Sequence, residues 1–231
     1  MTHLMYIFPG QGSQYRSIGK DLYESYESAK DIYHQASELL GYDLAELSFN
    51  DQKDQVGLTR YTQPVLFTHQ MACFEIFNEL TDNNHTPDLL AGHSLGEYTA
   101  LVAAGALEFK TALNLVHHRG TLMGDHGAGE MEALSLGLKE AELLAEKHLC
   151  SIAACNLPDQ TVVGGLSEDL DKLVDELTEQ FPKKRSSRLK TEGAFHTYYM
   201  VEAARRFRLI LDKAPLISPQ IRVLSNYTGG F

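Results

Sequence analysis

The chain has 231 residues, enough to bury a sizeable core in one or two domains. Its content of 43% hydrophobic and 22% charged residues is that of an ordinary globular protein. The net charge of -11 argues against nucleic acid as the main partner, because phosphate binding needs a basic surface. No apolar run is long enough to span a bilayer, and residues 1–8 lead into a glycine turn rather than resembling a signal peptide. We therefore expect neither a nucleic-acid nor a membrane partner.

The three cysteines, Cys73, Cys150 and Cys155, form an odd and sparse set without metal-ligand spacing. Such a set fits a reducing compartment better than a disulfide framework. We expect a cytoplasmic protein with no metal site.

Hydrophobic periodicity predicts an α/β arrangement before residue 124. Pro64 fits the first turn of a helix, where its missing N–H removes no hydrogen bond. In chain order we expect a strand at 4–8, a helical stretch from 22 to near Gly41, a helix at 63–80, a strand at 89–91, and helices from 97 and at 111–123.

The pattern of expected strands and helices changes after a glycine-rich segment at 124–129. From there the pattern is β-α-β-β-α-β, the signature of a ferredoxin-like unit, with one turn at 156–159. A helix at 200–214 and a strand at 221–225 follow. We expect an α/β fold in which a small ferredoxin-like subdomain at 128–195 is inserted into a large subdomain formed by residues 1–127 and 196–231.

Gly92-His93-Ser94-Leu95-Gly96 lies between a predicted strand and a predicted helix, which is the placement of a nucleophile elbow. The serine of such an elbow sits in a strained turn, where bulkier residues in place of the glycines would clash. The amide of Leu95 can then hold an oxyanion at the helix N-terminus. The alternative is a packing turn of small residues.

A serine nucleophile needs a base, and the ten histidines leave that choice open on spacing alone. The candidates are His93, His117, His118 and His196, the last of which falls at the predicted junction of the subdomains. Only two strands precede Ser94, so the order of elements differs from that of a standard α/β-hydrolase.

At this point the sequence resembles malonyl-CoA:acyl carrier protein transacylases and the acyltransferases of polyketide synthases, especially the free-standing, trans-acting ones. The resemblance extends from Tyr6 to Asn226, and its five motifs occur in the family's order. They are Phe8-Pro9-Gly10-Gln11-Gly12-Ser13-Gln14, Thr62-Gln63-Pro64, Gly92-His93-Ser94-Leu95-Gly96-Glu97, Arg119-Gly120 and Ala194-Phe195-His196.

The resemblance implies an α/β-hydrolase-like large subdomain and a catalytic pair. Ser94 would be the nucleophile and His196 its general base. The backbone amides of Gln11 and Leu95 would form the oxyanion hole. Backbone carbonyls near Asn226, in Ser225-Asn226, would orient the histidine.

The resemblance also implies the substrate. Arg119 would bind the free carboxylate of a malonyl group, a role that suits a guanidinium fork. Ala194-Phe195-His196 resembles the malonyl-preferring form of its motif. Gln63 and Asn156 match further pocket positions, although a polar helix start and a turn asparagine explain them equally well.

The expected activity is transfer of malonyl from coenzyme A, a substrate rather than a cofactor, to the phosphopantetheine thiol of an acyl carrier protein, for fatty acid or polyketide biosynthesis. No cofactor is expected. The acidic carrier protein could dock on the basic residues Lys183, Lys184, Arg185, Arg188 and Lys190, or these could form a solvated face. A second possible docking site is formed by Arg205, Arg206 and Arg208.

Two alternatives stay open, a proofreading acyl hydrolase of the same fold and a non-catalytic partner that docks carrier protein. The sequence departs from the family at Gly164, where serine is usual, and at Glu132, where a small residue is common. Family members also continue beyond Phe231, so we expect the C-terminal part of the large subdomain to be missing.

Overall fold

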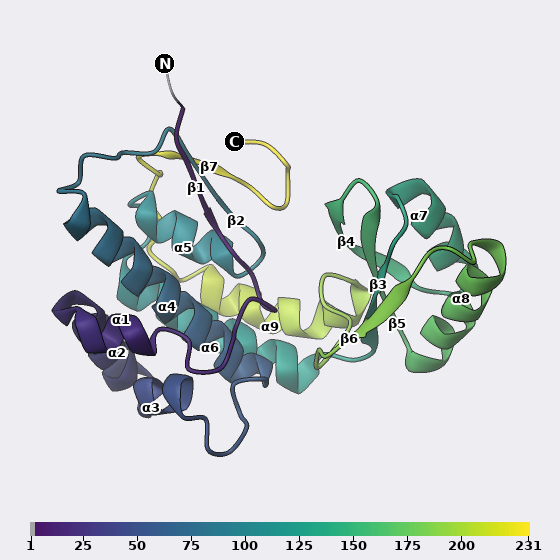
Figure 1. Ribbon diagram of the computed structural model, residues 1–231, viewed down its shortest axis with the longest axis horizontal. Coiled ribbons are helices and arrows are strands. Elements are labelled where there is room, and N and C mark those ends of the chain that lie inside the picture. The colour runs from purple at the N-terminus through teal and green to yellow at the C-terminus, as the bar shows by residue number, and fades with distance from the viewer. Residues whose placement is uncertain (1–2) are drawn as a thin grey trace. The chain divides into compact units, whose positions relative to one another are not determined.

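The computed structural model describes residues 3–231, so residues 1 and 2 of the predicted large subdomain lie outside the described residues. The chain divides into two units, drawn in Figure 1. The first runs to Gly120 and resumes at Ile210–Phe231, and the second is Thr121–Leu209. Helices α6 (Phe109–His126) and α9 (Val201–Leu211) belong in part to each. Within residues 3–231, no helix has both the length and the apolar character needed to cross a membrane.

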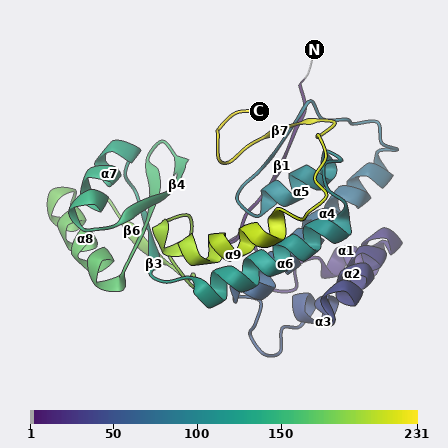
Figure 2. The same ribbon diagram turned by 180° about the vertical axis from the view of Figure 1, so that it is seen from behind.

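The first unit is built on a parallel sheet in the order β1-β2-β7. Apolar side chains of the strands pack against α4 and α5 through Phe8, Leu90, Phe74 and Ala100. The strands and these helices can be followed from both sides in Figures 1 and 2. The bounds are β1 (Met5–Phe8), β2 (Leu89–Gly92), β7 (Arg222–Leu224), α1 (Lys20–Ser25), α2 (Glu27–Leu40), α3 (Leu44–Phe49), α4 (Thr59–Leu80) and α5 (Gly96–Ala103).

Two sequence expectations for this unit need correction. Helix α4 begins at Thr59, so Pro64 lies inside the helix and Gln63 is not at its start. Almost every side chain from Thr62 to Met71 is buried, and this burial outweighs the one intrahelical bond that proline cannot make. The helical stretch from 22 to near Gly41 is divided at Tyr26, whose backbone is extended.

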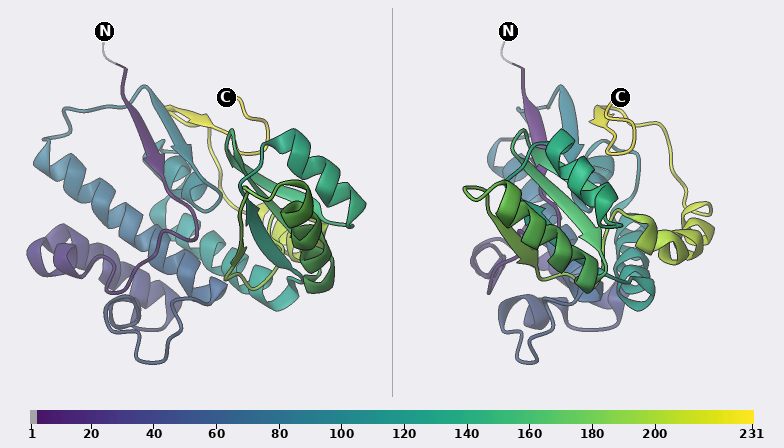
Figure 3. Two further views of the ribbon diagram at one scale, coloured as in Figure 1. Left: turned by 45° about the vertical axis from the view of Figure 1, so that its right-hand side comes forward. Right: turned by 90° about the vertical axis from the view of Figure 1, so that its right-hand side faces the viewer.

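The second unit contains an antiparallel sheet in the order β4-β5-β3-β6. Helices α7 and α8 cover one face through Leu134, Leu144, Val163 and Leu173. In Figure 3, right, these helices lie in front of the strands. The bounds are β3 (Glu130–Leu134), α7 (Leu138–Lys147), β4 (Ser151–Leu157), β5 (Gln160–Gly165), α8 (Ser167–Gln180), β6 (Ser186–Leu189) and the short 3-10 helix η1 (Tyr198–Met200).

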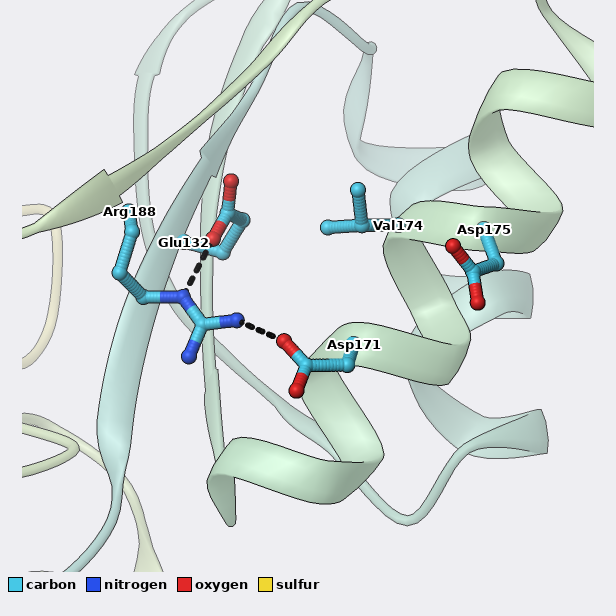
Figure 4. Close-up of a pocket in the computed structure, with 5 residues that line it drawn as sticks. All are labelled: Glu132, Asp171, Val174, Asp175 and Arg188. Carbon is cyan, nitrogen blue, oxygen red and sulfur yellow. Dashed lines mark hydrogen bonds and ion pairs between the residues drawn. The ribbon is translucent and has the colours of Figure 1, made fainter.

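A buried carboxylate lies in this sheet at Glu132, which is 3% exposed. Arg188 stands directly opposite it on β6 and donates to it over 2.7 Å. The same guanidinium reaches Asp171 on α8 over 2.7 Å (Figure 4). It also contacts Glu130 on β3. Desolvation lowers the pKa of Arg188, but the three carboxylates outweigh it and raise the pKa overall. Glu132, which stands where a small residue was expected, therefore has Arg188 as its counterion.

Arg188→Ala should destabilise the protein by an amount near the lower end of the roughly 3–5 kcal/mol typical of a broken buried pair. It leaves the carboxylate of Glu132 buried without its cation, while the 32% exposure of Arg188 moderates the cost. Urea unfolding followed by circular dichroism measures the difference. Arg185→Ala, at an exposed position of the same segment, is the matched control and should stay within about 0.5 kcal/mol of the parent.

Candidate active site

Ser94 lies in a sharp turn between β2 and α5, with a backbone φ of 52°. A positive φ is strained for a residue with a side chain. The turn closes tightly, because a Cβ on Gly92 would come within 1.9 Å of the carbonyl carbon of Gly96. A Cβ on Gly96 would come within 2.2 Å of the carbonyl oxygen of Phe8. Both glycines are therefore required for this geometry.

The start of α5 directs backbone N–H groups toward this turn. The first amides of a helix have no intrahelical partner and carry the positive end of its dipole. Leu95 is the N-cap residue of α5 and directly follows Ser94. The oxyanion of an acyl group attached to Ser94 would thus lie beside the amide of Leu95, which was predicted to form part of the oxyanion hole.

A buried relay fixes the loop that follows β1. Thr99 on α5 donates to the side-chain oxygen of Gln70 on α4 over 2.7 Å, and Gln70 donates to the carbonyl of Pro9 over 2.8 Å. Thr99 is fully buried and Gln70 is 4% exposed. Gln11, two residues beyond Pro9, anchors its side chain on Thr59 over 3.2 Å. The relay therefore sets the position of the backbone at Gln11.

Arg119, Gln63 and Ser94 meet within the first unit. Arg119 donates through Nη2 to the hydroxyl of Ser94 over 2.9 Å and through Nη1 to Oε1 of Gln63 over 2.8 Å. Gln63 is fully buried in the second turn of α4. The hydroxyl of Ser94 accepts in this contact, because the arginine can only donate.

Gly120 explains why the helix carrying Arg119 can approach α4. A Cβ at Gly120 would lie 2.7 Å from the carbonyl oxygen of Thr59 and 3.4 Å from Cβ of Gln63. Any larger residue would separate α6 from α4 at this level. The pairing Arg119-Gly120 thus combines a cation with the space that brings it against Gln63.

The charge of Arg119 has no carboxylate partner among residues 3–231. Burial lowers the pKa of its guanidinium, while Tyr98 and Glu97 oppose that effect. The Tyr98 ring lies 5.9 Å from the guanidinium carbon. Because arginine stays protonated in proteins, this is a desolvated cation held by neutral acceptors. Such a group favours an anionic ligand.

Asn226 reaches the elbow from the segment after β7. Its side-chain oxygen accepts from the backbone N–H of Ser94 over 2.7 Å, and its side-chain nitrogen donates to the carbonyl of Gly92 over 2.6 Å. Its backbone N–H donates to Glu97 over 3.1 Å. The family resemblance implied only that backbone carbonyls near Asn226 orient His196. It gave no indication of these side-chain contacts.

His196 and Asn156 belong to the second unit. His196 is exposed, with a φ of 63°, on the loop between β6 and η1. Asn156 lies within β4 rather than in the predicted turn, which consists only of Pro158 and Asp159. It occupies a register shift between Cys155 and Leu157, and such bulges often redirect a side chain next to a functional site.

The pattern of the acyl transferase domain family matches residues 5–229. A malonyl CoA-acyl carrier protein transacylase of Bacillus subtilis is 38% identical over 98% of this chain and 73% of its own length. The polyketide biosynthesis transacylase BaeC of Bacillus velezensis is 36% identical over 96% of this chain and 77% of its own. Among solved structures, the malonyl-transacylase in the PlMCAT:AntF complex with a type II polyketide synthase acyl carrier protein superposes with a TM-score of 0.91, at 31% identity over 97% of this chain and 74% of its own.

The chain belongs to the acyl transferase domain family. The α/β fold and the resemblance drawn from the five motifs are confirmed, and the protein is an acyltransferase.

Thr99→Val should destabilise the protein by about 1–3 kcal/mol, since it leaves the buried oxygen of Gln70 without a donor. Thr68→Val is the matched control, because Thr68 is equally buried and its hydroxyl has no hydrogen-bond partner among residues 3–231. It should be neutral or stabilising. Urea unfolding of both variants measures the contrast, and equal effects would contradict the relay.

Proposed function

We propose that the chain transfers a malonyl group from coenzyme A to the phosphopantetheine thiol of an acyl carrier protein. One observation carries the proposal. The guanidinium of Arg119 lies on the hydroxyl of an elbow serine, Ser94, and has no carboxylate partner among the described residues. Malonyl brings the missing carboxylate and, a short distance away, the thioester carbonyl that the serine attacks. The relatives named for this reaction support the assignment.

The first half-reaction acylates Ser94. Its Oγ attacks the thioester carbonyl carbon of malonyl-CoA and gives its proton to His196, in the role implied by the family resemblance. The amides of Leu95 and Gln11 stabilise the tetrahedral oxyanion. The carbon–sulfur bond then breaks, and coenzyme A leaves with the proton from the imidazolium.

The second half-reaction reverses these steps with a different thiol. The phosphopantetheine thiol gives its proton to His196 and attacks the ester carbonyl. The carbon–oxygen bond to Ser94 breaks, and the serine recovers the proton. This route needs no cofactor, and Arg119, with Gln63 and Asn156, holds the extender group through both steps.

The finer architecture and the compartment are part of the same proposal. The order β3-α7-β4-β5-α8-β6 within the second unit is consistent with a ferredoxin-like small subdomain at 128–195. The parallel sheet of the first unit is consistent with an α/β-hydrolase-like large subdomain. A cytoplasmic location fits the three free cysteines.

Arg119 also distinguishes this function from a proofreading hydrolase of the same fold. A hydrolase acting on acyl groups without a carboxylate would keep the guanidinium desolvated and without a counterion in every complex. That cost has no evident benefit for such a reaction. The site therefore favours a carboxylated acyl group.

Lys183, Lys184 and Arg185 are three adjacent residues of the basic run that are open to an acidic partner. All three are exposed, whereas Arg188 is engaged by Glu132 and Asp171. Exposed charges of one sign steer an oppositely charged partner and raise its association rate. We assign this segment to carrier-protein docking.

Arg119→Ala should reduce malonyl loading of Ser94 by about 100-fold or more, because the carboxylate loses its bidentate partner. Loading from acetyl-CoA should stay level or rise, because acetyl has no carboxylate to lose. Intact-protein mass spectrometry after incubation with each donor measures both adducts.

Arg205→Ala, at an exposed position, should load like the parent. Ser94→Ala must show no adduct with either donor. Malonyl loading that survives Arg119→Ala would overturn the substrate assignment, and a parent protein that gains no mass would favour a docking partner without catalysis.

Reversing Lys183, Lys184 and Arg185 to glutamate should raise the apparent KM for a holo acyl carrier protein several-fold and spare self-acylation. The increase should shrink as salt is added, because these charges are exposed and screened. Steady-state transfer assays at two ionic strengths test both expectations.

The matched control reverses Lys53, Lys110 and Lys213, three exposed lysines outside this segment, and makes the same change in net charge. An equal rise in KM for both triple variants would show an effect of net charge rather than of a docking surface.

A further inference from the structure

We propose that the Asn226 side chain is a positioning residue for the nucleophile. It holds the elbow by its two ends, accepting from the N–H of Ser94 and donating to the carbonyl of Gly92. These are the backbone groups on either side of His93. The inference rests on the proposed function, because its effect is expressed through acylation of Ser94.

The two side-chain contacts of Asn226 extend the pairing of β2 with β7 beyond the last backbone pair. The ladder between β2 and β7 ends at Ala91 and Leu224. Beyond it the chain turns sharply away at Ser94, so that a further backbone partner on β7 would no longer face it. Asn226, two residues after Leu224, presents one acceptor and one donor from a single planar amide. This amide substitutes for the next pair of the ladder.

The backbone of Asn226 is itself tied to the other side of the elbow. Its N–H donates to the carboxylate of Glu97, in the first turn of α5. Asn226 therefore contacts the strand before Ser94, Ser94 itself and the helix after it. A residue bonded at all three points limits the ways in which a strained turn can relax.

This role is separate from the one implied by the family resemblance. That role uses backbone carbonyls near Asn226 to orient His196 and does not depend on the side chain. The clamp depends on the amide and acts on the position of Oγ of Ser94. Side-chain substitutions therefore separate the two.

Asn226→Ala should lower the single-turnover rate of malonyl loading by about tenfold to hundredfold, as expected when a reacting atom is misplaced by a fraction of an ångström to an ångström. The Kd for malonyl-CoA, measured in a Ser94→Ala background, should not change, because Arg119 still meets the carboxylate. A loss of rate with an equal loss of affinity overturns the clamp.

Asn226→Asp is the second and sharper test, because it keeps the shape of the side chain. An ionised aspartate still accepts from Ser94 but sets a negative oxygen against the carbonyl of Gly92. A protonated aspartate restores the donor. The rate of the variant divided by the parent rate should therefore be lowest at pH 8 and rise toward pH 5. Glu97 raises the pKa of the introduced carboxyl, while the N–H of Ser94 and the guanidinium of Arg119 lower it.

Asn84→Asp, in an exposed loop of the first unit, makes the same change in charge and should give a ratio near one at every pH. Rates for both Asn226 variants within twofold of the parent rate at pH 8 overturn the clamp. Failure of the parent protein to load malonyl at all would instead overturn the proposed function, so the two failures are distinguishable.

Discussion

The strained backbone at Ser94 is the constraint on which the rest of the site depends. A non-glycine residue held at positive φ costs about 1–3 kcal/mol and persists only when its surroundings fix it. Here the surroundings are the close contact of Gly92 with Gly96, the carbonyl of Phe8 beneath that contact, and the start of α5. The same turn that holds the hydroxyl also directs helix amides toward it, so the proposed nucleophile and the proposed oxyanion hole share one local geometry.

The second constraint is electrostatic and comes from the packing of α4 against α6. Gly120 lets the helices approach, and the approach desolvates the guanidinium of Arg119 between Gln63 and Ser94. Neutral acceptors satisfy two of its five donors without neutralising its charge. Binding an anion removes this deficit, whereas an uncharged acyl group cannot. The proposed selectivity for a carboxylated substrate thus rests on the cost of holding this cation without an anion.

The sequence predicted what depends on local pattern and missed what depends on distant polar pairs. The elbow, with its flanking strand and helix, follows from spacing and residue type, whereas Arg119 with Gly120 was singled out by the family resemblance. The clamp from Asn226 joins residues 132 apart, and the relay from Thr99 to Gln70 joins residues 29 apart, with no periodicity to reveal either. The helix start predicted from Pro64 was wrong, because burial of the surrounding side chains stabilises the helix more than the proline destabilises it. The counterion of Glu132 could not be predicted either, because Arg188 lies opposite it on a neighbouring strand, 56 residues further along the chain.

Backbone strain also marks the position proposed for the base. His196 has a φ of 63°, and its loop packs closely against β5 within the second unit. A Cβ at Gly164 would lie 2.9 Å from both Cβ of Ala194 and Cγ2 of Thr197, the residues that flank Phe195 and His196. Gly164 therefore leaves room for this close approach, since a side chain there would meet Ala194 and Thr197. Because a strained residue holds its conformation only when packing prevents relaxation, the close approach limits the ways in which the loop carrying His196 can relax.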